Sequence, residues 1–317
     1  MIAQKMPSPS DSAKVAILLC TRNGELFLQQ QLDSYATQTH NNWTVYASDD
    51  ASSDTTRDIL ERQQKSWGHD RLIIISGPRL GGPANFMALI GRDDLEADYF
   101  AFSDQDDIWE AGKLAAAVTW LQTTSSNRPA LYCGRTSYID ERGEILGLSP
   151  KQPQPPSFAN ALVQNIAGGN TMVMNQAARR LIKALTQSMP VVVHDWWTYQ
   201  AVTGCGGEVH FATVPTVRYR QHPGNLIGAN SGWASRLRRA GESLRGLHRE
   251  WCDTQLAALA VVESDLTPAN ARILAGFSRA RQQWLLPRVL GILRSGVHRQ
   301  TCGQQLWFLV QVLFNRL

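Results

Sequence analysis

The stretch FAFSDQDDIWEAGK, residues 100–113, decides how the rest of the chain is interpreted. It begins with an apolar and aromatic run that is typical of a short buried strand. The run leads directly into three carboxylates, Asp104, Asp106 and Asp107. Carboxylates this close repel one another unless a cation or hydrogen-bond donors lie among them. The stretch therefore indicates either a site for Mg²⁺ or Mn²⁺, which prefer oxygen ligands, or a solvated loop in which Asp107 caps the next helix.

Strand and helix patterns alternate in the first part of the chain. Strands are predicted at residues 15–20, 43–47, 71–76 and 99–103, and helices at residues 25–37, 54–64 and 84–91. This alternation predicts an α/β fold in which a mostly parallel, Rossmann-like sheet is flanked by helices. The strands that end near Ala47 and Phe102 both continue into acidic loops. In a parallel sheet these loops lie at the same edge, where ligands bind.

The pattern is weaker after residue 113. A helix is expected at residues 114–122, strands at 130–133 and 144–148 around a turn at 140–143, and a loop or linker at 151–156, KQPQPP. The segment AGGNTMVMN, residues 167–175, starts with two glycines and passes into a strand-like run, and a helix follows to about residue 187.

Two later segments supply polar candidates. VVVHDWWTY, residues 191–199, places Asp195 beside two tryptophans, which favours a raised pKa and a general base near neutral pH. Asp195 is an equally good N-cap for the following helix, and the two roles are compatible. PTVRYRQHPGN, residues 215–225, carries His222 after a strand-like run, and a histidine in such a loop is more often exposed than a ligand.

Several classes of protein lack support. No GxGxxG motif follows the first strand and no GxxxxGK[ST] motif is present, which disfavours a dinucleotide site and a P-loop. The five cysteines lack CxxC spacing, which argues against a disulfide framework or a zinc site and favours a reducing cytoplasm. Neither a signal peptide nor an apolar run of about 18 residues is seen, so no spanning helix is predicted.

The charge is unevenly distributed along the chain. Residues 231–317 hold twelve arginines and five acidic residues, whereas residues 1–230 hold nineteen basic and twenty-two acidic residues. Apolar, arginine-bearing stretches at residues 233–251, 285–294 and 306–317 have helical spacing. These helices are expected either to pack on the preceding domain or to lie in part on an anionic membrane surface. Their basic charge accompanies aliphatic residues and no RNA-binding motif, so nucleic acid is not an expected partner.

Six segments in this order and spacing resemble family 2 glycosyltransferases with the GT-A fold: VAILLCTRNGE, SDDASSD, FSDQDDIW, GGNTMVMN, HDWW and YRQH. The similarity covers residues 15–228 and is greatest to bacterial rhamnosyltransferase-like enzymes of O-antigen and related surface polysaccharide synthesis. The resemblance implies a GT-A domain at residues 15–230. The residues themselves predict a flexible tail at residues 1–14 and a basic amphipathic helical extension at residues 231–317.

The resemblance also implies roles for the donor and metal residues. Thr21 and Asp50 match positions that hold the donor nucleoside, and Arg22 lies beside them where an aromatic residue is common. Asp104 and Asp106 match the DxD motif, with Asp104 toward the ribose and the metal and Asp106 on the metal that binds the diphosphate. The metal is expected to be Mg²⁺ or Mn²⁺.

Three further positions follow from the same resemblance. His222 matches a histidine that completes the metal shell, and Asp195 matches the catalytic base. Gly169, Trp196 and Trp197 are expected near the sugar or acceptor, although the two tryptophans are equally consistent with a core position.

The implied activity is that of an inverting, metal-dependent glycosyltransferase of the hexosyltransferase class. It would move a sugar, with rhamnose favoured, from dTDP-rhamnose or a UDP-sugar to a hydroxyl of a lipid-linked glycan acceptor. The expected location is cytoplasmic, peripheral on the inner face of the cytoplasmic membrane. Two alternatives stay open: a sugar-nucleotide nucleotidyltransferase, whose glycine-rich phosphate loop is absent from CTRNGE, and a non-enzymatic carbohydrate-binding assembly protein, which leaves the acidic cluster unexplained.

Overall fold

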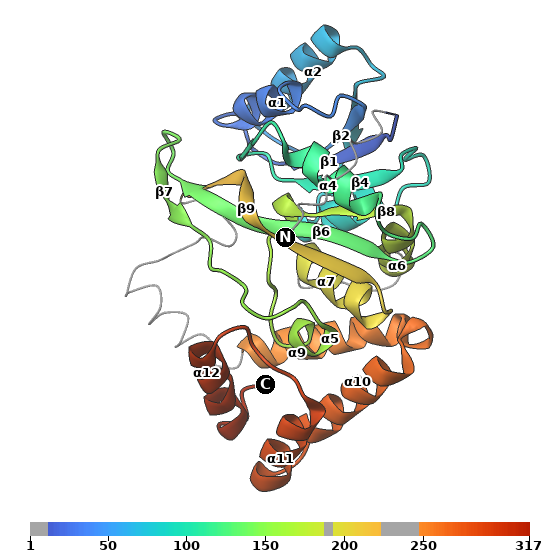
Figure 1. Ribbon diagram of the computed structural model, residues 1–317. Helices are drawn as coiled ribbons and strands as arrows, with labels where there is room; N and C mark the ends of the chain where they lie inside the picture. Colours follow the sequence, from blue (N-terminus) through green and yellow to red (C-terminus); the bar gives the residue numbers. More distant parts are fainter. Residues whose placement is uncertain (1–11, 187–192, 223–246) are drawn as a thin grey trace, which may run out of the picture.

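The computed structural model describes residues 12–186, 193–222 and 247–317 (Figure 1). Within them, a nine-stranded sheet has the order β3-β2-β1-β4-β8-β6-β9-β5, and β7 pairs with β6 outside this path. The mixed α/β architecture confirms the predicted fold class. The parts of the sheet on the two sides of β4 differ in direction and are described separately.

Four parallel strands form the first half of the sheet. They are β1 (Val15–Thr21), β2 (Trp43–Asp49), β3 (Leu72–Ser76) and β4 (Tyr99–Ser103). Every residue of β1 and β2 is buried, which explains their continuous apolar sequences. Val15 pairs with Trp43 on one side and with Tyr99 on the other, so the carboxyl ends of β2 and β4 lie at one edge, as predicted.

The second half of the sheet is mixed. It contains β5 (Ile108–Trp109), β6 (Ala130–Ile139), β7 (Ile145–Leu148), β8 (Val173–Asn175) and β9 (Glu208–Arg220). Strand β8 runs antiparallel to both β4 and β6, whereas β9 runs parallel to β6. The prediction of a mostly parallel sheet therefore holds only for the first four strands. Strands β6 and β9 are also longer than predicted, because polar and partly exposed residues interrupt their apolar pattern.

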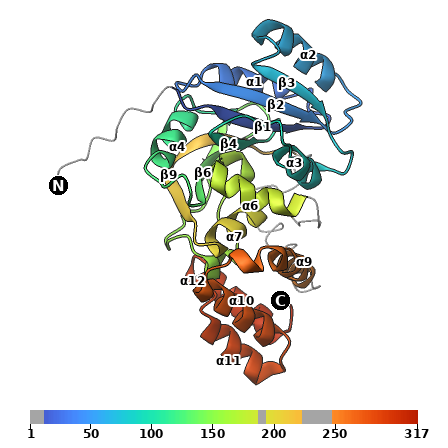
Figure 2. The same cartoon turned by 90° about the vertical axis from the view of Figure 1, so that its right-hand side faces the viewer.

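Helices cover both faces of the sheet (Figure 2). One face carries α1 (Leu28–Ala36), α2 (Thr56–Trp67) and α4 (Lys113–Leu121), and the other carries α3 (Gly82–Ile90), α5 (Phe158–Ala161), α6 (Gln176–Thr186) and α7 (His194–Gly204). Ile17 and Leu18, neighbours in β1, belong to different core clusters because side chains alternate across a strand. Short 3₁₀ turns lie at Gly169–Thr171 and Glu263–Asp265.

The chain ends in four helices, α9 (Leu247–Val261), α10 (Pro268–Arg281), α11 (Leu285–Ser295) and α12 (Cys302–Leu313). They lie at the end of the molecule remote from α2 (Figures 1 and 2). Leu259 and Phe277 share a core cluster with Trp197 of α7, so these helices continue the core of the preceding domain. Helices are confirmed at residues 285–294 and over most of 306–317. Most of the predicted stretch 233–251, and most of the predicted tail 1–14, lies outside the described residues.

Within the described residues, no helix combines the length and the apolar character needed to cross a membrane.

Candidate active site

The carboxyl ends of β1, β2 and β4 bring the predicted donor residues to one edge of the sheet. Thr21 pairs with Asp49 across β1 and β2, and Leu19 pairs with Ser103 across β1 and β4. The acidic loops that follow Asp49 and Ser103 therefore begin on either side of the last residues of β1. Segments far apart in sequence meet here because all three strands are parallel.

The Thr21 hydroxyl is held by a neighbour that the sequence did not single out. Thr21 Oγ1 donates to Asp49 Oδ1 at 3.0 Å, and the same oxygen accepts a hydrogen bond from Ser52 Oγ at 2.5 Å. Ser52 N donates to the other Asp49 oxygen at 3.2 Å. Asp49 thus fixes both Thr21 and the start of the loop after β2. Its only sequence signal is that it precedes Asp50 in the SDD segment.

Asp50 is buried beneath the loop that follows β3. Its Oδ1 accepts from Arg79 N at 2.5 Å, its Oδ2 accepts from Gly81 N at 2.8 Å, and Arg22 Nη1 lies 3.9 Å from Oδ2. Arg79 has a φ of 65°, an unusual conformation for a residue with a side chain, and the bond to Asp50 helps to hold it. Each carboxylate oxygen retains acceptor capacity for an N–H or hydroxyl of a ligand.

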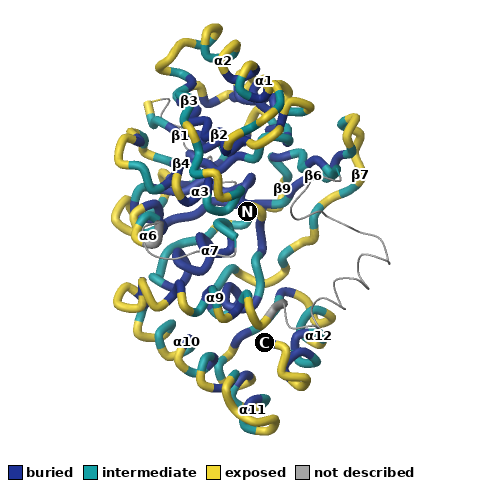
Figure 3. Tube along the Cα trace, turned by 180° about the vertical axis from the view of Figure 1, so that it is seen from behind, coloured by how far each residue is buried: buried dark blue, intermediate teal, exposed yellow. Residues whose placement is uncertain are grey.

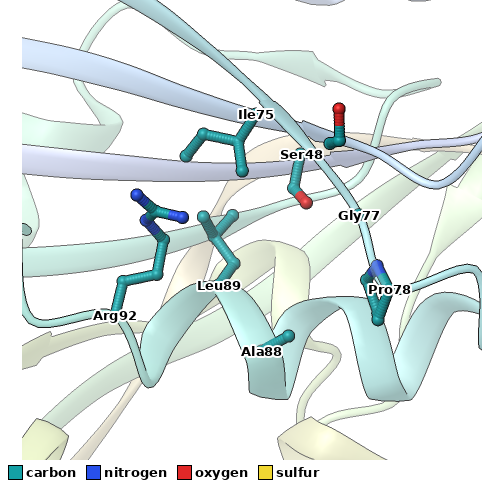
Figure 4. Close-up of a pocket in the computed structure, with 8 residues that line it drawn as sticks. Ser48, Ile75, Gly77, Pro78, Ala88, Leu89 and Arg92 are labelled. Atoms are coloured by element: carbon teal, nitrogen blue, oxygen red, sulfur yellow. The ribbon is translucent and has the colours of Figure 1, made fainter.

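A small cavity lies between the sheet and α3 (Figure 4). Its volume is about 170 Å³, and it is lined by Ser48, Ile75, Ser76, Gly77, Pro78, Ala88, Leu89 and Arg92. Ligand pockets are usually larger, about 300–1,000 Å³. Because none of the predicted donor carboxylates lines this cavity, we do not assign it to the donor.

Asp104, Asp106 and His222 are brought together at the end of β4. His222 Nε2 lies 2.7 Å from Asp106 Oδ2, although 116 positions separate the two residues. Burial, with smaller contributions from the charges of Asp106 and Asp195, raises the pKa of Asp104 to about 7, and the charge of Lys113 acts against this rise. The ionised form of Asp104 is therefore disfavoured in this environment, and a cation bound nearby would stabilise it.

Asp104, Asp106 and His222 provide only part of a metal site. No group of three or more histidine, cysteine or acidic side chains in the described part of the chain is arranged as a complete cluster of metal ligands. Asp106 and His222 nevertheless place an oxygen and a nitrogen donor side by side. Ions such as Mg²⁺ are often held by one or two carboxylates and completed by substrate phosphates. This partial donor set fits an ion that binds together with a diphosphate.

Gln105 ties the acidic loop to the end of β1. Its Oε1 accepts from Arg22 N at 2.8 Å, and its Nε2 donates to Arg22 O at 3.0 Å. A Cβ at Gly24 would lie 2.3 Å from Gln105 Oε1, so Gly24 leaves room for this contact. Sequence reasoning missed Gln105, because nothing marks the residue between the two aspartates as a partner of Arg22.

Asp107 is fully buried and does not cap a helix. Asp107 Oδ2 accepts from Asn170 Nδ2 at 2.5 Å, and Oδ1 accepts from Arg220 N at 3.1 Å. Helix α4 begins only at Lys113, with Gly112 at the N-cap. The interpretation of Asp107 as a cap in a solvated loop is therefore wrong.

Lys113 completes this buried polar group. Lys113 is also fully buried; its Nζ donates to Asn170 O at 2.7 Å and lies 3.1 Å from the centroid of the Trp109 ring. Burial raises the pKa of Asp107 and lowers the pKa of Lys113, and for Lys113 the charges of Asp107 and Asp104 act against burial. We call Asp107, Lys113, Asn170 and Arg220 the buried polar network.

Arg220 anchors the main chain of the acidic loop. Its Nε donates to Asp106 O at 2.9 Å, and its Nη2 donates to Gln30 Oε1 at 2.7 Å in α1. The guanidinium lies 4.5 Å from the centroid of the Phe27 ring. Sequence reasoning missed Lys113, Asn170 and Arg220. The sequence offers one weak indication for two of them: Lys113 and Arg220 are charged residues at the edge of an apolar segment.

Asp195 lies in the first turn of α7, which begins at His194 with Val193 at the N-cap, so the N-cap interpretation is wrong. Asp195 Oδ2 accepts from Gly169 N at 3.1 Å, and Oδ1 accepts from Trp196 N at 2.6 Å. Burial raises the pKa of Asp195 to about 6, although these hydrogen bonds act against it. A carboxylate with this pKa is mostly ionised and still basic near neutral pH.

The aromatic residues of the HDWW segment, His194, Trp196 and Trp197, belong to the core. Trp196 is 7% exposed and donates from Nε1 to Ala161 O at 2.7 Å, and Trp197 is 0% exposed. The His194 ring stacks on Phe86 with a centroid distance of 3.9 Å. The expectation that the two tryptophans contact a sugar is therefore corrected to the core position, the alternative that the sequence left open. Gly169, by contrast, does lie against Asp195.

A half-sheet of parallel strands whose carboxyl ends gather acidic residues, continued by a mixed half-sheet, is the architecture of GT-A glycosyltransferases. The chain belongs to glycosyl transferase family 2, whose sequence profile matches residues 16–182. It is therefore a glycosyltransferase, and the two alternatives considered from the sequence are set aside.

Several relatives are similar over most of their length. dTDP-rhamnosyl transferase RfbG of Shigella flexneri is 30% identical over 273 residues, which cover 82% of this chain and 89% of that protein. The glucosyltransferase WfaP of Escherichia coli, named UDP-Glc:alpha-D-GlcNAc-diphosphoundecaprenol beta-1,3-glucosyltransferase, is 23% identical over 67% of this chain and 79% of its own. Among solved structures, S. aureus TarS 1-349 in complex with UDP-GlcNAc matches with a TM-score of 0.55 and 14% identity, over 96% of this chain and 89% of that one. This match confirms the fold.

The buried polar network generates a prediction about stability. Lys113→Met keeps an unbranched side chain but removes the ammonium group that binds Asn170 O. A lost hydrogen bond to a charged group should lower the free energy of unfolding by about 1.5–3 kcal/mol. Urea unfolding at neutral pH measures the change, and Lys65→Met, at an exposed position of α2, is the control with an expected effect within about 0.5 kcal/mol. Equal stability of both variants would contradict a stabilising role for Lys113.

Proposed function

We propose that this glycosyltransferase is inverting and metal-dependent. In this proposal it moves a sugar, with rhamnose favoured, from dTDP-rhamnose or a UDP-sugar to a hydroxyl of a lipid-linked glycan in surface polysaccharide synthesis. One observation carries the proposal: Gly169 N donates to Asp195 at 3.1 Å, and the adjacent Asn170 donates to Asp107 of the acidic loop at 2.5 Å. The carboxylate proposed as the base and the carboxylates proposed for the donor therefore belong to one site.

The donor residues have separate proposed roles. Thr21, Arg22 and Asp50 bind the nucleoside, and Asp104 binds its ribose and the metal. Asp106 and His222 hold the ion, Mg²⁺ or Mn²⁺, on the side of the diphosphate. When bound, this ion offsets the negative charge that develops on the leaving nucleoside diphosphate. The oxygen and nitrogen donors at Asp106 and His222 support this assignment.

Asp195 is the proposed general base. It removes the proton from the acceptor hydroxyl as that oxygen forms a bond to the anomeric carbon. The bond from the anomeric carbon to the diphosphate oxygen breaks on the opposite face, and the electron pair leaves with the diphosphate. A single displacement of this kind inverts the anomeric configuration. Gly169 N–H, which donates to Asp195, orients the carboxylate and places Gly169 beside the acceptor.

The names of two relatives support the finer assignments. RfbG is a dTDP-rhamnosyl transferase, which favours rhamnose as the sugar. WfaP is named for a diphosphoundecaprenol-linked acceptor, which favours a lipid-linked acceptor here. Such an acceptor implies that the enzyme is cytoplasmic and works as a peripheral protein at the inner face of the cytoplasmic membrane.

The role of Asp195 is tested by Asp195→Asn. Loss of a general base should lower kcat by about 10²–10⁴-fold. Donor affinity, measured by calorimetry, should change only a few-fold, because the base acts in the chemical step. In the unmodified enzyme kcat should rise with pH through about 6, the pKa of Asp195, and then level off. Asp58→Asn, at an exposed position of α2, is the matched control. A parallel collapse of donor affinity and rate would instead make Asp195 a binding or structural residue.

The metal role is tested by Asp106→Asn and His222→Ala. Asp106→Asn should remove transition-state stabilisation on the order of several kcal/mol and nearly abolish transfer. His222→Ala should shift the Mn²⁺ titration of activity to higher concentration while the affinity for the acceptor changes less. Asp70→Asn, an exposed substitution, should leave both unchanged. A folded Asp106→Asn enzyme with near-normal turnover and an unaltered Mn²⁺ titration would rule out the metal assignment.

A further inference from the structure

Helix α11 presents an apolar stripe to solvent. Leu286, Leu290 and Leu293, spaced by four and three residues, are 59%, 51% and 53% exposed. Trp284, just before the helix, and Leu285 at its start are also exposed. The opposite side of the helix buries Arg288 and Ile292. Such a stripe is unusual on a soluble surface and normally marks a surface that binds a partner or a membrane. We call Leu286, Leu290 and Leu293 the α11 face.

A basic groove borders the α11 face. It lies between α10 and α11, has a volume of about 560 Å³, and is lined in part by Arg272, Arg279 and Arg294. On α11 the groove is lined by Pro287, Gly291 and Arg294, each one position after a leucine of the stripe. One position is a rotation of about 100° around a helix, so the groove and the stripe are neighbours. No carboxylate of the described residues forms an ion pair with any of these three arginines.

The whole end of the molecule shares this character. Leu306 and Leu313 of α12, seven residues apart, are 66% and 50% exposed, as is Phe314 at 66%. Figure 3 shows α10, α11 and α12 together at one end, with extensive exposed stretches on α11. Residues 266–317 contain seven arginines and no aspartate or glutamate. The exposed apolar side chains therefore belong to a segment whose charged residues are all arginine.

This combination favours one occupant. A second copy of the chain on a two-fold interface would bring the same arginines together, with no acidic residue from this region to pair with them. An anionic bilayer surface accepts the leucines and tryptophan at its acyl boundary and attracts arginines to its headgroups. We propose that the α11 face and the arginines of the bordering groove dock the enzyme on an anionic lipid surface. The proposal deepens the proposed function, on whose lipid-linked acceptor it rests.

The C-terminal helices are connected by close contacts to α7, the helix that carries the proposed general base Asp195. Helix α7 runs from the site at Asp195 to Gly204, about 16 Å for its eleven residues. At its far end Asn270 Nδ2, in the first turn of α10, donates to Thr203 O at 3.0 Å and to Gly204 O at 2.9 Å. A Cβ at Gly204 would lie 2.7 Å from Leu266 Cδ2, so the end of α7 is in close contact with the segment that leads into α10. Docking through α10 and α11 would therefore fix the orientation of Asp195 relative to the bilayer.

The test is flotation of the full chain with two kinds of vesicle. One kind contains phosphatidylglycerol and phosphatidylcholine, and the other contains phosphatidylcholine alone. The bound fraction should be at least about tenfold greater with the anionic vesicles and should fall as salt is raised. The double variant Leu290→Asp/Leu293→Asp should lose about tenfold of this binding. The double variant Arg279→Gln/Arg294→Gln should lose the part of the vesicle binding that is weakened by salt.

Matched controls come from the rest of the surface. Leu146→Asp changes a leucine of β7 that is 61% exposed, and Arg62→Gln changes an exposed arginine of α2. Both should float like the unmodified chain. Thermal melting of every variant shows that it is folded, and the arginine pair, which leaves the apolar stripe intact, tests the proposal even if the leucine pair misfolds.

Several results would overturn the proposal. The full chain could fail to float, or it could float equally well with both kinds of vesicle. Both double variants could float as well as the controls. Light scattering could also show a dimer that becomes a monomer in Leu290→Asp/Leu293→Asp. Donor binding by calorimetry separates this proposal from the proposed function. A chain that floats selectively but binds no nucleotide-sugar contradicts the proposed function alone, and a chain that binds donor but does not float contradicts the docking surface alone.

Discussion

The site depends on one buried carboxylate, Asp107, and on the groups that satisfy it. Its two oxygens accept hydrogen bonds from Asn170 and from the main chain of Arg220, so it joins the loop after β4 to the 3₁₀ turn before β8 and to the end of β9. Gly169, next to Asn170, donates to Asp195. A buried charge of this kind is costly unless every partner is in place. The same interaction that makes the acidic loop rigid thus also sets the position of the proposed base relative to Asp104 and Asp106.

The sequence predicts the first half of the fold well and the second half poorly, for a physical reason. Strands buried on both faces, such as β1 and β2, have continuous apolar sequences that are easily recognised. Strands β8 and β5 have three and two residues, too few to show any period, and the thirteen residues of β9 mix buried, intermediate and exposed positions without a regular period. Their pairing, including the antiparallel contact between β4 and β8, is decided by tertiary structure.

The site follows the same division. Asp104, Asp106, Asp195 and His222 were recognisable because they lie in segments that resemble a known family, and the structure brings them together. The buried polar network was not recognisable, because Lys113 and Asn170 are 57 positions apart and lysine is rarely buried. The tryptophans show the reverse error: aromatic residues beside the proposed base suggest a surface for stacking a sugar, but exposed fractions of 7% and 0% leave them in the core. Composition did indicate the basic, apolar character of the C-terminal end, but its exposed leucines are visible only once the helices are placed.

The central claim is that one edge of the sheet binds the donor and presents its anomeric carbon to Asp195. The most direct measurement is a co-crystal structure of the full chain with Mn²⁺ and a non-hydrolysable nucleotide-sugar. We expect the nucleoside at Thr21 and Asp50, the diphosphate and the ion at Asp106 and His222, and the face of the anomeric carbon opposite the diphosphate turned toward Asp195. A donor bound elsewhere, or bound at this edge with its anomeric carbon facing away from Asp195, would contradict the account.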